Sequence, residues 1–184
     1  ARELTDKPFG VNIMLMHPQV DELMEIVIEK KVPVVTTGAG NPGKYVPALK
    51  EAGIKVMPVV PSAKVAKKME DLGADAVVCS GMEAGGHIGE VSTLAMIPVA
   101  HRLCTIPIVA AGGIGDGRGV AGAFAMGAEG VQCGTAFIVA DECNASDGYK
   151  DAIVNALESD TRVYRNPGTG RNVRTVTSPL VEKF

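Results

Sequence analysis

The chain has 184 residues, of which 46% are hydrophobic and 21% charged, and its formal net charge is −3. This length suffices for one domain with a sizeable core, and the weak negative charge argues against nucleic acid or an anionic membrane as a partner. No apolar run reaches the ~18 residues of a transmembrane helix, and residues 1–7 are polar, unlike a signal peptide.

Six short runs rich in valine and isoleucine recur along the chain. They lack the strict alternation of apolar and polar residues that marks a half-exposed strand, and this is typical of strands covered on both faces in a parallel sheet. The predicted strands are 9–15, 32–36, 55–60, 74–79, 106–111 and 130–134.

Helical patterns fill the gaps between these runs. The predicted helices are 20–28, 44–52, 62–72, 93–103, 117–126 and 148–158, with Ser62 as an N-cap, Asp116 as another, and Pro98 as a kink. Segments 72–79 and 126–133 are similar to each other: in both, a helix ends at a glycine, an acid begins the next strand, and the strand runs to a cysteine. We assign both glycines to left-handed C-caps, and the repeat indicates equivalent strand–helix units.

Alternating strands and helices predict an α/β fold, either an open doubly wound sheet or a TIM (β/α)8 barrel. The barrel is favoured because loops of small residues follow nearly every predicted strand. A closed barrel needs eight strands, so we expect an incomplete barrel, or a fragment of a longer protein. The four cysteines, Cys79, Cys104, Cys133 and Cys143, form no C-x-x-C pair. We interpret them as reduced thiols of a cytoplasmic protein, and no metal site is predicted.

Two pairs of small residues follow the last two predicted strands, Gly112-Gly113 and Gly134-Thr135. Free backbone N–H groups at such positions bind anions, and glycine lets a ligand oxygen approach the backbone closely. The two pairs together predict a phosphate cradle, although glycines also occur in turns without a ligand.

His87 is surrounded by Gly85, Gly86 and Gly89, just past a predicted buried strand. Either it caps a glycine-rich turn, or the absence of neighbouring side chains opens its ring to a ligand, where it acts as an acid, a base or a hydrogen-bond donor. Two amides, Asn12 and Gln132, interrupt apolar strands and must either bond neighbouring backbone or face a ligand. Segment 36–42 is expected to contribute the floor of the same pocket.

Five motifs in this order resemble those of the FabK-type enoyl-acyl carrier protein reductases, whose relatives are the nitronate monooxygenases (formerly 2-nitropropane dioxygenases). The motifs are 6–14 (DKPFGVNIM), 35–42 (VTTGAGNP), 58–61 (PVVP), 81–90 (GMEAGGHIGE) and 110–117 (AAGGIGDG), and the resemblance runs from about residue 4 to 184.

The resemblance implies that residues 1–184 form a partial FMN-binding TIM-barrel domain, equivalent to strands three to eight of the barrel. It implies a flavoprotein oxidoreductase in which NADH or NADPH reduces FMN, and the reduced flavin then passes hydride to a trans-2-enoyl thioester in fatty acid synthesis. His87 matches the histidine beside the flavin ring. That histidine is the base in the monooxygenases, and in the reductases it positions the nucleotide or supplies a proton. The implied cofactor-binding residues are Asn12, Ser80, Gly85, Gly86, Gly112, Gly113, Gln132, Gly134 and Thr135. Ser80 stands where the reductases usually carry an acid.

The implied partner is an enoyl thioester, either a small molecule or one bound to acyl carrier protein. A homodimer is one assembly compatible with the sequence. Two alternatives stay open at this point. One is a nitronate monooxygenase, which uses oxygen as electron acceptor and needs no nicotinamide. The other is a non-catalytic flavin- or phosphate-binding fragment.

Overall fold

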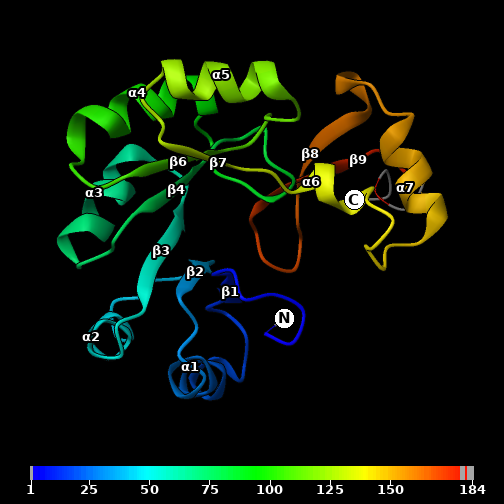
Figure 1. Cartoon of the computed structure of the whole chain (residues 1–184). Helices are drawn as coiled ribbons and strands as arrows, with labels where there is room; N and C mark the ends of the chain where they lie inside the picture. The colour runs from blue at the N-terminus through cyan, green and yellow to red at the C-terminus, as the bar shows by residue number, and fades with distance from the viewer. Residues whose placement is uncertain (1, 179–180, 182–184) are drawn as a thin grey trace.

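A curled sheet of six parallel strands is the frame of the molecule (Figure 1). The computed structural model describes residues 2–178 and 181. Along the sheet the order is β1-β2-β3-β4-β6-β7, which is the order in the sequence. The strands are β1 (Gly10–Met14), β2 (Val34–Gly38), β3 (Lys55–Val60), β4 (Val77–Ser80), β6 (Ile108–Ala111) and β7 (Gly130–Gln132). All six predicted strands are therefore present, with ends shifted by a few residues.

The order of the strands decides between the two predicted architectures. Each strand pairs in parallel with the next strand of the sheet, for example Asn12 opposite Thr36 and Val78 opposite Val109. A doubly wound sheet reverses its order at a switch point, and this sheet does not. The fold is thus a partial TIM barrel, as predicted.

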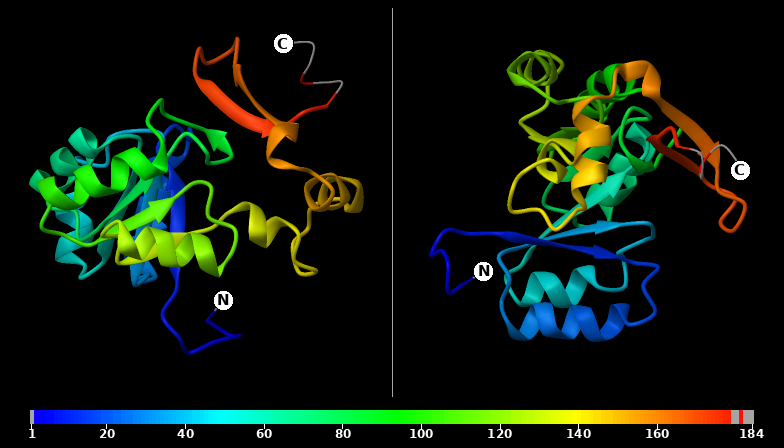
Figure 2. Two further views of the ribbon diagram at one scale, coloured as in Figure 1. Left: turned by 90° about the horizontal axis from the view of Figure 1, so that it is seen from above. Right: turned by 90° about the vertical axis from the view of Figure 1, so that its right-hand side faces the viewer.

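The helices that connect the strands lie on the outside of the curl (Figure 2). They are α1 (Val20–Glu29), α2 (Val46–Glu51), α3 (Ala63–Asp71), α4 (Thr93–Leu103) and α5 (Gly117–Ala125). Ser62 and Asp116 cap α3 and α5 as predicted, since the Ser62 hydroxyl accepts from Val65 N–H and the Asp116 carboxylate from Arg118 N–H. Helix α4 continues through Pro98.

The core lies between the sheet and this outer layer of helices. In the first three strands, Ile13, Val35 and Val56 are buried in one apolar cluster with side chains of α1 and α2. Their neighbours along each strand point to the concave face, because successive side chains of a strand alternate. There Asn12 is exposed and Thr36 is half-buried. A second cluster joins α3, α4 and α5 to β4 and β6.

Four helices end in the same way, with a left-handed residue just after the C-cap. At the end of α3, Gly73 N–H donates to Glu70 carbonyl and Ala74 N–H to Met69 carbonyl, which satisfies two carbonyls of the last turn. The left-handed residues are Lys31 (φ 47°), Gly53 (75°), Gly73 (94°) and Gly127 (100°). The predicted glycine C-caps of the two similar segments are confirmed.

One carboxylate ties α3 to the strand after α4. Glu70 accepts hydrogen bonds from Thr105 N–H (2.7 Å), the Thr105 hydroxyl (2.6 Å) and Ile106 N–H (3.1 Å). The ion pair with Lys67, and after it these donors, lower the pKa of Glu70 to about 2. The carboxylate is therefore charged at neutral pH and holds the turn before β6 against the end of α3.

A second, smaller sheet stands at the mouth of the barrel and was not predicted. It has the order β5-β9-β8 and is antiparallel. Its strands are β5 (Gly86–His87), β8 (Thr161–Arg165) and β9 (Asn172–Val176). Between β7 and β8 come α6 (Thr135–Ile138), α7 (Asp147–Val154) and the 3-10 turn η1 (Glu158–Asp160). The helix expected over 148–158 is thus shorter, because the chain turns at Leu157, whose N–H donates to the Asp160 carboxylate.

Within residues 2–178 and 181, no helix has the length and apolar character needed to cross a membrane. In the same part of the chain the four cysteines are unpaired, and the structure brings together no group of three histidine, cysteine, aspartate or glutamate side chains that could hold a metal ion.

The helix ends give a matched pair of substitutions. In Lys31→Gly the side chain that strains the left-handed backbone is removed, and we expect the free energy of unfolding to rise by about 0.5 kcal/mol. Gly73→Ala should lower the free energy of unfolding by about 1 kcal/mol, because it places a Cβ on a left-handed backbone. That Cβ would make only an ordinary contact with Val46, at 3.5 Å, so the expected loss comes from backbone strain and not from a clash. Urea unfolding measures both, and changes of the same sign would contradict the assignment.

Candidate functional site

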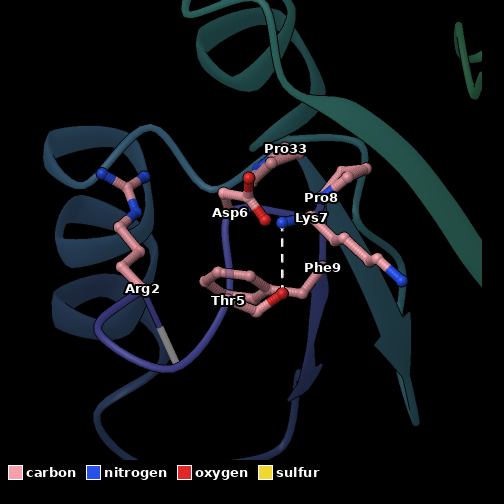
Figure 3. Close-up of a pocket in the computed structure, with 7 residues that line it drawn as sticks. All are labelled: Arg2, Thr5, Asp6, Lys7, Pro8, Phe9 and Pro33. Atoms are coloured by element: carbon pink, nitrogen blue, oxygen red, sulfur yellow. Dashed lines mark hydrogen bonds between the residues drawn. The ribbon is translucent and has the colours of Figure 1, made fainter.

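Two cavities lie at opposite ends of the parallel strands. One, of about 420 Å³, is lined by Arg2, Thr5, Asp6, Lys7, Pro8, Phe9 and Pro33 (Figure 3). It lies where β1 and β2 begin, and its one internal hydrogen bond in the figure runs from Lys7 N–H to the Thr5 hydroxyl (3.2 Å). Barrel enzymes place their chemistry at the other end, where the strands finish. We therefore do not assign a function to this cavity.

The larger cavity, of about 670 Å³, lies at the end where the strands finish. Its walls combine apolar side chains of β3 and α3 with polar groups of the loop after β4 and of the β8–β9 hairpin. The lining residues used below are Ala39, Gly40, Val59, Val60, Pro61, Ser80, His87, Ile88, Glu90, Arg165, Arg171 and Asn172. Ser80 and His87, both predicted site residues, therefore face one space.

The loop that carries His87 is held at its base by Glu83. The Glu83 carboxylate accepts hydrogen bonds from Thr93 N–H (2.9 Å) and from the Thr93 hydroxyl (2.9 Å), at the first turn of α4. Thr93 is buried, and its hydroxyl also lies 3.0 Å from the Gly112 carbonyl. A Cβ at Gly81 would overlap Thr93 and Glu83, so only glycine fits there. The role of Glu83 as an anchor was not predicted from the sequence. Its position in the loop between a predicted strand and a predicted helix start is the signal that could have indicated it.

The far side of the loop is held by β9. Gly86 and His87 pair with Arg174 and Val173 in antiparallel register. The Arg174 side chain donates from Nε to the Met82 carbonyl (2.9 Å) and from Nη1 to the Thr161 hydroxyl (3.0 Å). The backbone of His87 is thus fixed while its side chain stays exposed, which is suitable for contact with a ligand.

The residues predicted to form a phosphate cradle gather against this loop. Gly112 (φ 102°) and Gly113 (φ 71°) are consecutive left-handed glycines, and a Cβ on Gly112 would lie 3.0 Å from Ala84 N. A Cβ on Gly85 would lie 3.9 Å from the Thr135 hydroxyl oxygen. The loops after β4, β6 and β7 therefore meet at one edge of the barrel.

Open space lies above part of this edge. A Cβ at Gly86 or at Gly134 would have no neighbour within 4 Å, so ligand atoms have room to approach the backbone at both positions. Gln132 is exposed and stands in register with Ala111, which in turn pairs with Ser80. Neighbours in register on parallel strands share a face, so Gln132 points to the same side as Ser80.

Asn12 stands apart from this group, on the first strand. Its Oδ1 accepts a hydrogen bond from the Thr36 hydroxyl (2.9 Å), its neighbour across β1 and β2. This bond leaves the amide nitrogen as the group able to donate into the concave face. Of segment 36–42, Ala39 and Gly40 line the larger cavity, and the floor of a ligand pocket stays a prediction for this segment. Ala39 is left-handed (φ 56°), a strained conformation of the kind found at binding sites.

The assembled site offers hydrogen-bond donors and an imidazole. Backbone N–H groups, the Ser80 and Thr135 hydroxyls, the Gln132 amide and the His87 ring surround the barrel edge. Such a set binds a polar or anionic ligand and can hold or move a proton next to it.

Comparison with known proteins gives one consistent family. The profile of the family described as nitronate monooxygenase matches residues 19–184. The structure of FabK from Thermotoga maritima is 52% identical and superposes with a TM-score of 0.95, over 99% of this chain and 58% of that chain. A (3aS,4S,5R,7aS)-5-hydroxy-7a-methyl-1-oxo-octahydro-1H-indene-4-carboxyl-CoA dehydrogenase of Rhodococcus jostii is 40% identical, over 100% of this chain and 52% of that protein. A probable nitronate monooxygenase of Staphylococcus aureus is 39% identical, over 97% of this chain and 55% of that protein. The chain thus spans about half the length of the curated relatives it matches.

Glu83→Ala tests the anchoring of the loop. The substitution leaves the Thr93 N–H without its carboxylate partner in a half-buried position, and we expect it to lower the free energy of unfolding by about 2 kcal/mol. Glu90→Ala, in the same loop but without a hydrogen bond in the described residues, is the control and should change it by less than about 0.5 kcal/mol. Equal effects in urea unfolding would mean that Glu83 does not anchor the loop.

Proposed function

This chain belongs to the nitronate monooxygenase family, and from that premise we propose that the protein is an FMN-dependent enoyl-thioester reductase of the FabK type that takes electrons from NADH or NADPH. The observation that carries the proposal is the 52% identity to FabK along 99% of the chain, against 39% to the probable nitronate monooxygenase. A thioester substrate is also in keeping with the Rhodococcus relative, whose name contains a carboxyl-CoA group.

The residues at the barrel edge fit a flavin mononucleotide. The left-handed glycines Gly112 and Gly113, with Gly134 and Thr135 opposite, offer backbone N–H groups and a hydroxyl to a phosphate. The open space at Gly86 and Gly134 leaves room for a group next to the backbone. Asn12, Ser80, Gly85 and Gln132 are the residues we propose for the polar edge of the ring. When bound, FMN would supply the two-electron redox chemistry of the reaction.

His87 is the residue that we propose to act on the substrate. Reduction of an enoyl thioester adds a hydride at the β-carbon and places negative charge on the thioester oxygen. A positioned N–H donor stabilises that charge, and a proton then completes the α-carbon. The exposure of the His87 ring, on a backbone fixed by β9, supports the proposal that it donates the hydrogen bond or the proton. The apolar wall of Val59, Val60 and Ile88 excludes water from an acyl chain beside it.

Nitronate oxidation is the second candidate, favoured by the name of the family profile and of the Staphylococcus relative. It would use the same barrel edge, and there His87 would be the base that removes the α-proton of a neutral nitroalkane to give the nitronate. A non-catalytic flavin- or phosphate-binding role is the third candidate, and it requires no turnover by His87.

One spectroscopic experiment separates the three. We expect the purified protein to show a flavin band that NADH or NADPH bleaches without oxygen, and that a crotonyl thioester restores. Bleaching of the band by a nitronate without a nicotinamide, followed by its restoration by oxygen, would identify the monooxygenase. The absence of a flavin band would leave the non-catalytic role.

His87→Ala tests the role of the imidazole. We expect the variant to keep its flavin band, because the backbone at the barrel edge is unchanged, and to lose roughly 100-fold in turnover with the crotonyl thioester. His101→Ala is the control, since His101 lies exposed on the outer helix α4. Wild-type turnover in His87→Ala would remove this residue from the mechanism.

A further inference from the structure

The β8–β9 hairpin carries arginines with very different surroundings. Arg174 is used by the fold, because its guanidinium donates to the Met82 carbonyl and to the Thr161 hydroxyl. Arg165 and Arg171, near the turn of the hairpin, instead line the cavity into which His87 points. The family assignment does not explain why two cations should face this space.

The turn fixes the backbone of both arginines, whose side chains are exposed. Asn166 N–H donates to the Arg171 carbonyl (2.8 Å), Gly170 N–H donates to the Asn166 carbonyl (2.7 Å), and the Asn166 side chain accepts from Gly168 N–H (2.9 Å). Strand β9 pairs on its other side with β5, and Ile88 N–H donates to the Asn172 carbonyl (3.1 Å). The backbone that carries the two arginines is therefore fixed relative to the backbone of His87.

Within the part of the chain that the structure describes, neither guanidinium has a carboxylate partner. Among residues 2–178 and 181, no carboxylate lies within 4.0 Å of Arg165 or Arg171, since every ion pair there involves a lysine. Glu90 lines the same cavity but makes no such pair. The hydrogen bond of the Arg171 side chain is a weak one, from Nη1 to the Met16 sulfur (3.3 Å). Two unpaired cations beside an apolar wall, in a chain of net charge −3, form a local site for an anion.

We propose that Arg165 and Arg171 bind the phosphate groups of the substrate that enters the His87 cavity. This rests on the proposed function, in which both substrates carry phosphate: a nicotinamide dinucleotide has a diphosphate, and so has a coenzyme A thioester. The shared chemistry is a phosphate ester anion, and the planar guanidinium matches its oxygens with two parallel hydrogen bonds.

The shape of the cavity fits a ligand of this kind. At about 670 Å³ it holds the reactive end and part of the arm of such a substrate, rather than the whole molecule. The wall of Val59, Val60 and Ile88 suits an acyl or pantetheine chain, and the two arginines on the hairpin then receive the phosphate end of that chain. Specificity for phosphate-bearing over simple substrates would come from the hairpin rather than from the barrel.

The test is direct binding to the purified holoprotein by isothermal titration calorimetry, with coenzyme A, NAD⁺ and pantetheine as probes. The double variant Arg165→Met/Arg171→Met is compared with Arg162→Met. Arg162 and Arg165 are three residues apart on β8, so their side chains point to opposite faces of the strand. Arg162 does not line the cavity. The control therefore removes a charge from the same strand without changing the site.

We expect the double variant to bind coenzyme A or NAD⁺ at least tenfold more weakly than the wild type, whereas pantetheine, which has no phosphate, binds equally to both. Weakening for coenzyme A alone assigns the arginines to the thioester, and weakening for NAD⁺ alone assigns them to the nucleotide. The proposal is overturned if the double variant binds all three probes as Arg162→Met does, or if the wild type binds neither phosphate-bearing probe. Failure of the reductase proposal itself is seen separately, as a reduced flavin that the crotonyl thioester does not reoxidise.

Discussion

Two backbone pairings, Gly86 with Arg174 and His87 with Val173, attach the β8–β9 hairpin to the glycine-rich loop after β4. A loop with this many glycines has a high conformational entropy, and it would not hold an imidazole in one place by itself. Strand β9 supplies the missing partner for its backbone, and Arg174 adds a side-chain bond to Met82. The cavity, the position of His87 and the position of the hairpin arginines all depend on this one antiparallel contact.

The barrel edge supplies the second half of the site through close packing of backbone. Glu83 and Thr93 join the loop after β4 to the start of α4, and Thr93 reaches the carbonyl of Gly112 in the loop after β6. Small residues are required because these segments approach one another closely. A Cβ on Gly112, for example, would lie 3.0 Å from the backbone nitrogen of Ala84. The same glycines then leave N–H groups and space for a ligand. Packing and binding therefore select the same residue type here, which is why the motif alone does not separate a tight turn from a phosphate site.

Local patterns predicted the elements of the barrel well. Buried parallel strands are continuous apolar runs, and the helices between them carry caps such as Ser62 and Asp116 that act over only a few residues. The β8–β9 hairpin was not predicted, because its residues are polar and half-exposed, and its main partner is a two-residue strand far away in the sequence. For the site, Ser80 and His87 were predicted and do share one cavity, whereas Arg165, Arg171 and the anchor Glu83 were missed. Each of these three residues looks like an ordinary surface charge until its neighbours are known.

The sequence by itself determined the alternation of strands and helices, the glycine-terminated helices and the family motifs, since these depend on periodicity, on caps and on which residue types tolerate a left-handed backbone. The loops of small residues already favoured a barrel over a doubly wound sheet, and the strand order in the tertiary structure settled that choice. Only the tertiary structure decided that the hairpin lies across the mouth of the barrel and which residues it brings there. Those features arise from contacts between segments remote in the chain, whose energies depend on position in space. No local pattern contains that information, and for this chain it is what places two arginines and a histidine around one cavity.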